Sequence, residues 1–383
     1  MDPRVRAQQL SRVAAALVLG LVAGAPAARA EPYLMVRSGA KCSDCHTNQT
    51  GGGKRTPFAQ IHARDILHDL DLLPIPRGVK AFTGEVNQWI SIGADLRVRN
   101  RTVFQDHIRN GRVDNNTAFR ERVLSNDTDV NEFNGYLQVD LWPDVATFYV
   151  DESLNGGATN REVFGLVRGF LPWDTYVKAG RMFPAFGLRV FDDEAFIRAR
   201  SGFTFQNPDE GAEIGLAPGP FFFATTVTNG QDGDKDVQAT VNGYAVIQDV
   251  PVLKHLVGGA SFARQSDKRN VAAVYGGSNL WRFTYLGEVD FIHDHQPSTV
   301  GRRDQLAAYA EVNLLLLDWL NLRGTFDFVK VSHDQDQTRY AIGAEPFINR
   351  VIQPRIQYRI NNGVERRPEE NTDELIFELH MFF

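Results

Sequence analysis

Most of this 383-residue chain alternates apolar and polar side chains, and the alternation limits its fold more than any other feature. The pattern begins near Trp89 and continues to the C-terminus. Across 90–98, apolar residues occupy every second position, and Ser, Gly, Asp and Arg lie between them. Side chains two residues apart share one face of a β-strand, so each such segment has an apolar face and a polar face. A long series of these segments predicts an all-β structure.

Two kinds of all-β structure show this alternation. A soluble sandwich packs its apolar faces inward, whereas a transmembrane barrel turns them to lipid and lines its lumen with polar side chains. We count about sixteen segments, and an even number is typical of bacterial outer-membrane barrels. Short connections at 143–144 and 317–318 alternate with longer ones at 105–130, 295–303 and 362–371, as periplasmic turns and outer loops do.

The aromatic residues favour the barrel. All five tryptophans lie at the short connections, which predicts an aromatic girdle at one membrane interface: Trp89, Trp142, Trp173, Trp281 and Trp319. The last segment alternates up to a terminal aromatic residue, Phe383. The sequence therefore predicts that residues 84–383 form an antiparallel transmembrane β-barrel of about sixteen strands in contact with outer-membrane lipid.

Residues 1–30 have the three parts of a secretory signal peptide. Several arginines precede a short apolar core at 13–23, and Ala-Arg-Ala at 28–30 matches a cleavage site. The apolar run is short for a membrane anchor. We expect an exported mature chain that begins at Glu31.

The only two cysteines belong to one motif, Cys42-Ser43-Asp44-Cys45-His46. C-x-x-C-H is the attachment site of a c-type haem. The two thiols would bond to the haem vinyl groups, and His46 would be the proximal iron ligand because it adjoins the second attachment point. Export satisfies the need for attachment outside the cytoplasm. We expect one covalently attached haem c.

Two other interpretations of the cysteines stay open. They can form a C-x-x-C redox disulfide, although such a pair usually begins a helix in a βαβ unit, and no such pattern surrounds it here. They can also bind zinc together with His62 and His68, although the gap from Cys45 to His62 is longer than usual and His46 would then be idle.

The segment 31–83 is too small to form a hydrophobic core of its own, and we expect it to be a haem-binding plug. Its run Gly51-Gly52-Gly53 allows a tight turn and a close approach of the backbone to a bulky group. The sixth position of the iron needs a second ligand. The candidates, in order, are His62, His68, Met35 and the inward-facing His380.

Arginines on the inward faces of the strands are candidates for binding the haem propionates, because guanidinium groups bind carboxylates well. Arg97 and Arg99 are the first candidates, and Arg323, Arg355 and Arg359 also face inward. The alternative is that these arginines form a charge ladder with acidic residues of the lumen, as in any porin.

The connection after Arg181 is long and unusually rich in Asp, Glu, Arg and Phe over 190–210. It can fold inward as a constriction or lie outside as an ordinary extracellular loop. The sequence favours neither.

The signal peptide, the motif at residues 42–46, the barrel pattern and Phe383 together resemble the outer-membrane cytochrome–porin fusions. In these proteins a monohaem segment precedes a sixteen-stranded barrel, and the best-known members are iron-oxidising outer-membrane cytochromes. The resemblance covers the mature chain as an architecture and is specific only at the motif. It implies a Gram-negative outer-membrane location, with both termini in the periplasm.

The resemblance also implies a function. Electrons would pass between an extracellular donor or acceptor, such as Fe(II) or a mediator, and periplasmic carriers such as cytochromes. With Fe(II) as donor the chain would act as an Fe(II) oxidase. The alternatives are a diffusion porin whose haem segment is a structural plug, and a haem sensor. The formal net charge of −6 argues against a nucleic-acid partner.

Overall fold

The computed structural model describes twelve stretches of the chain: residues 31–59, 83–105, 108–109, 112–113, 123–157, 159–230, 237–266, 268–298, 301–332, 336–348, 351–362 and 371–382. The predicted signal peptide and Phe383 lie outside the described residues. The candidate ligands His62 and His68 also lie outside them.

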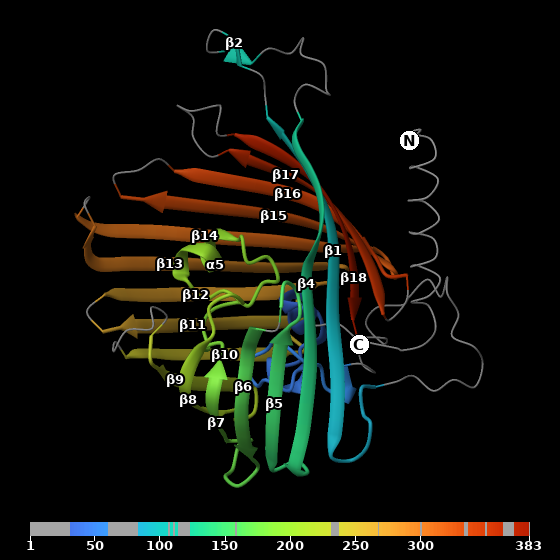
Figure 1. Cartoon of the computed structure of the whole chain (residues 1–383), viewed down its shortest axis with the longest axis vertical. Coiled ribbons are helices and arrows are strands. Elements are labelled where there is room, and N and C mark those ends of the chain that lie inside the picture. Colours follow the sequence, from blue (N-terminus) through green and yellow to red (C-terminus); the bar gives the residue numbers. More distant parts are fainter. Residues whose placement is uncertain are drawn as a thin grey trace.

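Sixteen strands form one closed antiparallel barrel (Figure 1). From β4 onward each strand pairs with the next, and β1 closes the ring by pairing with both β4 and β18. The strands are β1 (Ile90–Gln105), β4 (Val123–Trp142), β5 (Ala146–Ser153), β6 (Thr159–Arg168), β7 (Tyr176–Met182), β8 (Asp209–Leu216), β9 (Phe221–Thr228), β10 (Gln238–Gln248), β11 (His255–Gln265), β12 (Arg269–Leu280), β13 (Phe283–Ser298), β14 (Gly301–Leu317), β15 (Leu320–Val331), β16 (Gln337–Pro346), β17 (Ile352–Asn362) and β18 (Thr372–Phe382). A separate hairpin, β2 (Ile108–Arg109) with β3 (Arg112–Val113), follows β1. Closure leaves no unpaired strand edge, as a membrane barrel requires.

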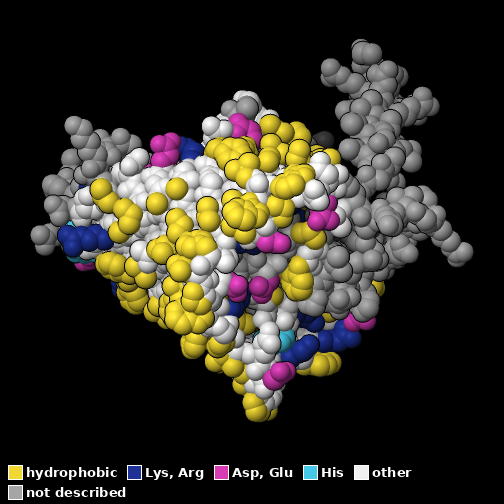
Figure 2. Space-filling view, turned by 90° about the horizontal axis from the view of Figure 1, so that it is seen from below, with side chains coloured by type: hydrophobic (Ala, Val, Ile, Leu, Met, Phe, Trp, Pro, Cys, Tyr) yellow, Lys and Arg dark blue, Asp and Glu magenta, His cyan; other side chains and the backbone are white. Residues whose placement is uncertain are grey.

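The strands turn apolar side chains outward, and their inward positions combine polar residues with apolar ones that pack against the leading part of the chain. On β9, Phe221 and Phe223 are 46% and 45% exposed, whereas the alternating Phe222 is 1% exposed. Figure 2 shows hydrophobic side chains over much of the surface in that view. The inward positions include many buried charged residues, among them Asp95, Lys178, Glu213, Asp290, Asp327 and Arg359. The predicted arrangement of a membrane barrel is confirmed.

The short connections lie at one end of the barrel, and the tryptophans lie with them. Trp142, Trp173 and Trp281 are 66%, 64% and 75% exposed. At the other end two predicted loops are shorter than expected. β4 begins at Val123, within the loop predicted at 105–130. β13 and β14 occupy most of the loop predicted at 295–303, because they run to Ser298 and from Gly301 and pair there. Polar side chains at the ends of these strands hid their length in the sequence.

The connection from β7 to β8, residues 183–208, folds into the lumen. It contains α5 (Phe196–Ser201), which packs against β13, β14 and β15 on the far side of the barrel (Figure 1). The Phe196 amide donates to Asp327 Oδ1 on β15 at 3.1 Å. Of the two interpretations of this loop, the inward one is correct; we call it the inward loop.

Residues 31–59, which we call the leading segment, also lie inside the barrel. They form α2 (Pro32–Ser38), packed against β11–β13, and α3 (Cys42–Cys45). Thr47 Oγ1 donates to Gln138 Oε1 on β4 at 2.8 Å, and Lys41 Nζ donates to the Gly219 carbonyl at 2.5 Å. Contacts on opposite walls hold the segment across the lumen. No helix of the described residues is long and apolar enough to cross a membrane.

Candidate functional site

The leading segment, the inward loop and the barrel wall enclose a cavity of about 1300 Å³, part of it open to solvent. We call it the motif cavity, because Cys42, Cys45 and His46 all line it. The facing walls come from the inward loop and the strands, through Tyr136, Arg161, Arg189, Phe205, Tyr244 and Tyr275. The motif is therefore surrounded by parts of the chain that are distant in sequence: the leading segment, the inward loop and the strands β4, β6, β10 and β12.

The two cysteines are free thiols at the two ends of α3. The Cys42 amide donates to the Tyr244 hydroxyl at 3.3 Å, which fixes the start of the helix to β10. Desolvation raises the pKa of Cys42, and it raises that of Cys45 to about 12. Burial therefore disfavours the thiolate form of both cysteines, the form that reacts in a redox pair.

His46 directly follows α3 and is 7% exposed. Its backbone forms an antiparallel bridge with Arg55, so the chain folds back on itself after the motif. Desolvation, and next the charge of Arg55, lower the pKa of His46 to about 3. The buried Nδ1 makes no hydrogen bond of standard geometry with the described residues. A neutral imidazole in an enclosed cavity suits a metal ligand.

The fold-back depends on the glycine run. Gly51, Gly52 and Gly53 have φ values of +91°, +83° and +64°, which other residues rarely adopt. A Cβ on Gly53 would collide with the Tyr149 hydroxyl, which accepts a hydrogen bond from the Lys54 amide at 2.8 Å. The predicted tight turn and close approach are both present. The approach is to a tyrosine of the barrel wall.

The structure separates the two arginines first chosen for the propionates. Arg97 lines the motif cavity, but it already pairs with Asp95 at 3.2 Å and Glu132 at 2.8 Å. Arg99 does not line the motif cavity; it donates to Asn131 and faces a second cavity. Sequence alternation gave their direction correctly but not their height in the lumen or their partners.

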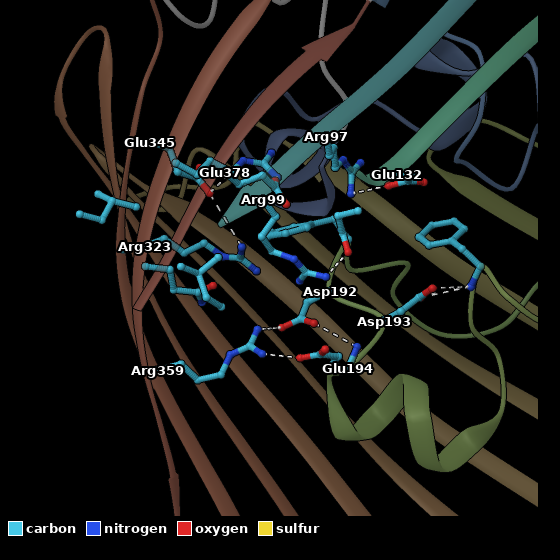
Figure 3. A pocket seen from close by; sticks show the side chains of 18 of the residues that line it. Arg97, Arg99, Glu132, Asp192, Asp193, Glu194, Arg323, Glu345, Arg359 and Glu378 are labelled. Atoms are coloured by element: carbon cyan, nitrogen blue, oxygen red, sulfur yellow. Dashed lines mark hydrogen bonds and ion pairs between the residues drawn. The ribbon is translucent and has the colours of Figure 1, made fainter. Parts of the chain in front are cut away.

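The second cavity, of about 1060 Å³ with some open solvent, we call the charged cavity (Figure 3). Arginines from β1, β15 and β17 form one side, and the acidic tip of the inward loop faces them. Arg359 pairs with Asp192 at 2.7 Å and with Glu194. Burial raises the pKa of Asp192, but Arg359 and Arg339 outweigh it and hold the pKa at about 2.

The charged cavity adjoins the motif cavity. Four residues line both of them: Arg97, Glu132, Phe191 and Phe205. The Phe191 ring lies between Arg323 and Arg355, whose guanidinium carbons are 4.3 Å and 4.5 Å from its centroid. The phenylalanines of this loop stand out in the sequence, but their positions could not be predicted from it, because the loop has no periodicity.

The remaining candidates for a sixth ligand differ in their surroundings. Met35 lines the motif cavity, and its Sδ lies 3.6 Å from Cys42 Sγ. His380 is buried on β18, but its Nε2 contacts Asp95 Oδ2 at 2.9 Å and its Nδ1 lies 3.4 Å from Gln353 Oε1. Both nitrogens of His380 are therefore occupied. Among the described residues, no three His, Cys, Asp or Glu side chains converge as a metal-binding group.

The residues of the motif cavity fit a c-type haem. Two free thiols and a neutral histidine line one cavity, and the buried Nδ1 of that histidine makes no hydrogen bond of standard geometry with the described residues. Leu34, Met35, Leu188, Phe191 and Phe205 give the cavity apolar surface of the kind a porphyrin contacts. The interpretation as a zinc site depends on His62 and His68, which lie outside the described residues.

Comparisons with known proteins identify the fold. No protein-family model matches the chain, and no curated protein matches its sequence. OmpT of Vibrio cholerae lacking loop L8 aligns with a TM-score of 0.55 and 11% identity, over 77% of this chain and 99% of that one. An anion-selective porin from Comamonas acidovorans aligns at 0.54 and 10%, over 77% and 99%. The channel DcaP of Acinetobacter baumannii aligns at 0.52 and 8%, over 77% and 97%.

The chain therefore has a porin-like outer-membrane β-barrel fold, with sixteen strands and an inward-folded loop. Identities this low show the fold alone. Within that fold, the lumen holds the leading segment, whose C-x-x-C-H motif lines a cavity beside the charged cavity.

Proposed function

We propose that the chain is a monohaem c-type cytochrome enclosed in a porin-like barrel, and that it carries electrons across the outer membrane. The observation that carries the proposal is the convergence of Cys42, Cys45 and His46 on one lumen cavity. Haem bound there supplies one-electron redox chemistry. The short-turn end of the barrel would face the periplasm, with its electron carriers, and the loop end would face an extracellular donor or acceptor such as Fe(II).

The chain's own residues would perform separate tasks. Cys42 and Cys45 attach the group, His46 ligates it, and the turn at 51–53 closes the segment against Tyr149. The barrel separates the cavity from lipid. The charged cavity shares a wall with the motif cavity. Small donors or acceptors in the lumen would reach the edge of the motif cavity through it. These features support electron exchange at both ends of the barrel.

The proposal is tested by electron transfer into sealed liposomes. Purified protein is reconstituted into vesicles loaded with ferricyanide, a membrane-impermeant reductant is added outside, and loss of ferricyanide absorbance is followed. Valinomycin and K⁺ compensate the transferred charge. We expect reduction well above the rate of protein-free vesicles, and a return to that rate with the haem-free variant Cys42→Ser/Cys45→Ser. Equal rates for wild type and variant would contradict electron transfer through the haem.

A diffusion porin with a structural haem plug is the second candidate, and the charged cavity is the observation that favours it. A cavity lined by charged side chains and open to solvent remains beside the leading segment. Single-channel conductance in planar bilayers tests it. Large solute conductance without reduction of the enclosed ferricyanide would favour the porin over the electron conduit.

A further inference from the structure

The motif cavity contains a buried cation that forms no ion pair within the described residues. Arg55 is 9% exposed and lines the cavity directly beside the backbone of His46. Its guanidinium carbon lies 4.2 Å from the centroid of the Phe382 ring. Within the described residues it has no ion pair, and its buried Nε has no hydrogen-bond partner.

The other cationic side chains of the cavity all have partners. Arg97 pairs with two acids, as described above, and Arg161 pairs with Glu132 at 2.6 Å and Asp151 at 3.6 Å. Arg189 donates to backbone carbonyls, including that of Gly51 at 2.7 Å, and Lys41 also donates to carbonyls. Arg55 is therefore the cavity-lining guanidinium with neither acid nor carbonyl partner among the described residues.

A guanidinium stays charged in a protein, and burying it without an anion is unfavourable. Stacking on Phe382 offsets only part of the lost hydration. An anionic group that enters the cavity would therefore gain a strong, charge-assisted contact at Arg55. A haem presents two carboxylates of this kind.

We propose that Arg55 is the propionate-binding residue of the site, in place of Arg97 and Arg99. The assignment rests on the proposed function, because it requires haem in the motif cavity. Arg97 would have to leave Asp95 and Glu132 to bind a propionate, whereas Arg55 has no acid to leave. Arg55 then positions the haem and raises its reduction potential, because a nearby positive charge favours the reduced state.

Lys54 provides a matched control. It is also a buried cation, 2% exposed, on the neighbouring residue, but it does not line the motif cavity. Its Nζ donates to the Arg55 carbonyl at 3.2 Å and to Gln138 Oε1 at 3.4 Å. Lys54→Gln and Arg55→Gln remove the same charge, yet only Arg55→Gln removes it from the cavity wall.

The first experiment titrates the midpoint potential of the haem-loaded full chain by absorbance between pH 5 and 9. Arg55→Gln should lower the midpoint potential and add a pH-dependent step, because the propionate left unpaired would take up a proton more readily. Arg55→Lys, which keeps the charge, should restore most of the wild-type profile. Lys54→Gln should add no such step.

A second experiment separates binding from a structural role. In the haem-free Cys42→Ser/Cys45→Ser chain, Arg55→Gln should raise the thermal denaturation midpoint by removing a buried, unpaired charge. In the haem-loaded chain it should lower that midpoint. Destabilisation of both forms, or identical pH profiles for the Arg55→Gln and Lys54→Gln variants, would overturn the assignment of Arg55 but not the proposed function. A wild-type protein without haem would overturn the proposed function and this assignment together.

Discussion

Single residues decide which chemistry the motif cavity permits. One of them would be the sixth ligand of the haem iron, on the side opposite His46. Met35 lines the cavity and lies on α2. Gly39 ends this helix in a left-handed conformation, with its backbone packed closely against the His255 side chain. His380 has both nitrogens occupied. Among the residues that the structure describes, Met35 is therefore the candidate for the sixth ligand. His62 and His68 stay predictions from the sequence.

Replacing Met35 by Leu should lower the midpoint potential and let the reduced haem bind carbon monoxide, because a thioether ligand raises the potential and its loss opens a coordination position. Absorption spectra and redox titration measure both effects. Met182→Leu is the control: Met182 is fully buried on β7 and does not line the cavity. An unchanged low-spin spectrum in the Met35→Leu variant would pass the role to His62 or His68.

At this scale the motif can be recognised in the sequence, and its haem chemistry stays a prediction; the surroundings of the motif could not be predicted. The order of Cys42, Cys45 and His46 is a local property, so it could be seen without a fold. The partners of Arg97 and the isolation of Arg55 depend on strand register and on the path of the chain after a glycine turn. Neither follows from residue spacing.

At the scale of elements, the inward loop shapes the lumen, and its acidic tip holds it in place. Asp192 pairs with Arg359 at 2.7 Å and with Arg339 at 3.6 Å, and α5 packs behind it on β13–β15. The strands could be predicted from the sequence, because alternation repeats along them. The direction of the loop could not, since it depends on arginines of distant strands.

Asp192→Asn should loosen the inward loop and lower the free energy of unfolding in lipid vesicles by about 2 kcal/mol, since buried Arg359 and Arg339 each lose one charge-assisted contact. Arg359 keeps Glu374 at 3.4 Å, and Arg339 keeps Asp327 at 3.2 Å. The pKa of Asp192 is held at about 2. Its contribution is therefore fully present above the unfolded pKa of about 3.9 and is lost as pH falls through about 2. Urea titrations at several pH values measure this.

The control is Asp144→Asn, whose side chain is 97% exposed in a short turn, and which should change the free energy of unfolding by less than about 0.5 kcal/mol. An Asp192→Asn variant as stable as this control at pH 7 would contradict the anchoring role of the loop tip.

At the scale of the whole molecule, one chain combines a lipid-facing barrel with a segment held across its lumen. Alternation, strand number and tryptophan placement were enough to predict the barrel. These features were enough because every strand of a membrane barrel must alternate lipid-facing apolar residues with residues that face the lumen. The fold of residues 31–59 against the inward loop follows no such rule and was not predictable in detail.

The orientation of the barrel predicts which residues are accessible on cells. Asn155→Cys, in the exposed connection between β5 and β6, should react with a membrane-impermeant maleimide on intact cells. Asp144→Cys and Asp318→Cys, in the short turns, should react only after the outer membrane is permeabilised. Both native cysteines would be blocked by haem, which keeps the background low. Labelling of Asp144→Cys but not Asn155→Cys on intact cells would reverse the proposed orientation.

The most direct test of the account is whether the mature chain carries one covalently attached haem at Cys42 and Cys45. Haem staining of a denaturing gel, with the intact mass of the same sample, measures it. We predict a stained wild-type band whose mass exceeds that of the chain by one haem. We also predict an unstained Cys42→Ser/Cys45→Ser variant that still folds as a barrel. A wild-type chain of unmodified mass, or a variant that still stains, would contradict the account.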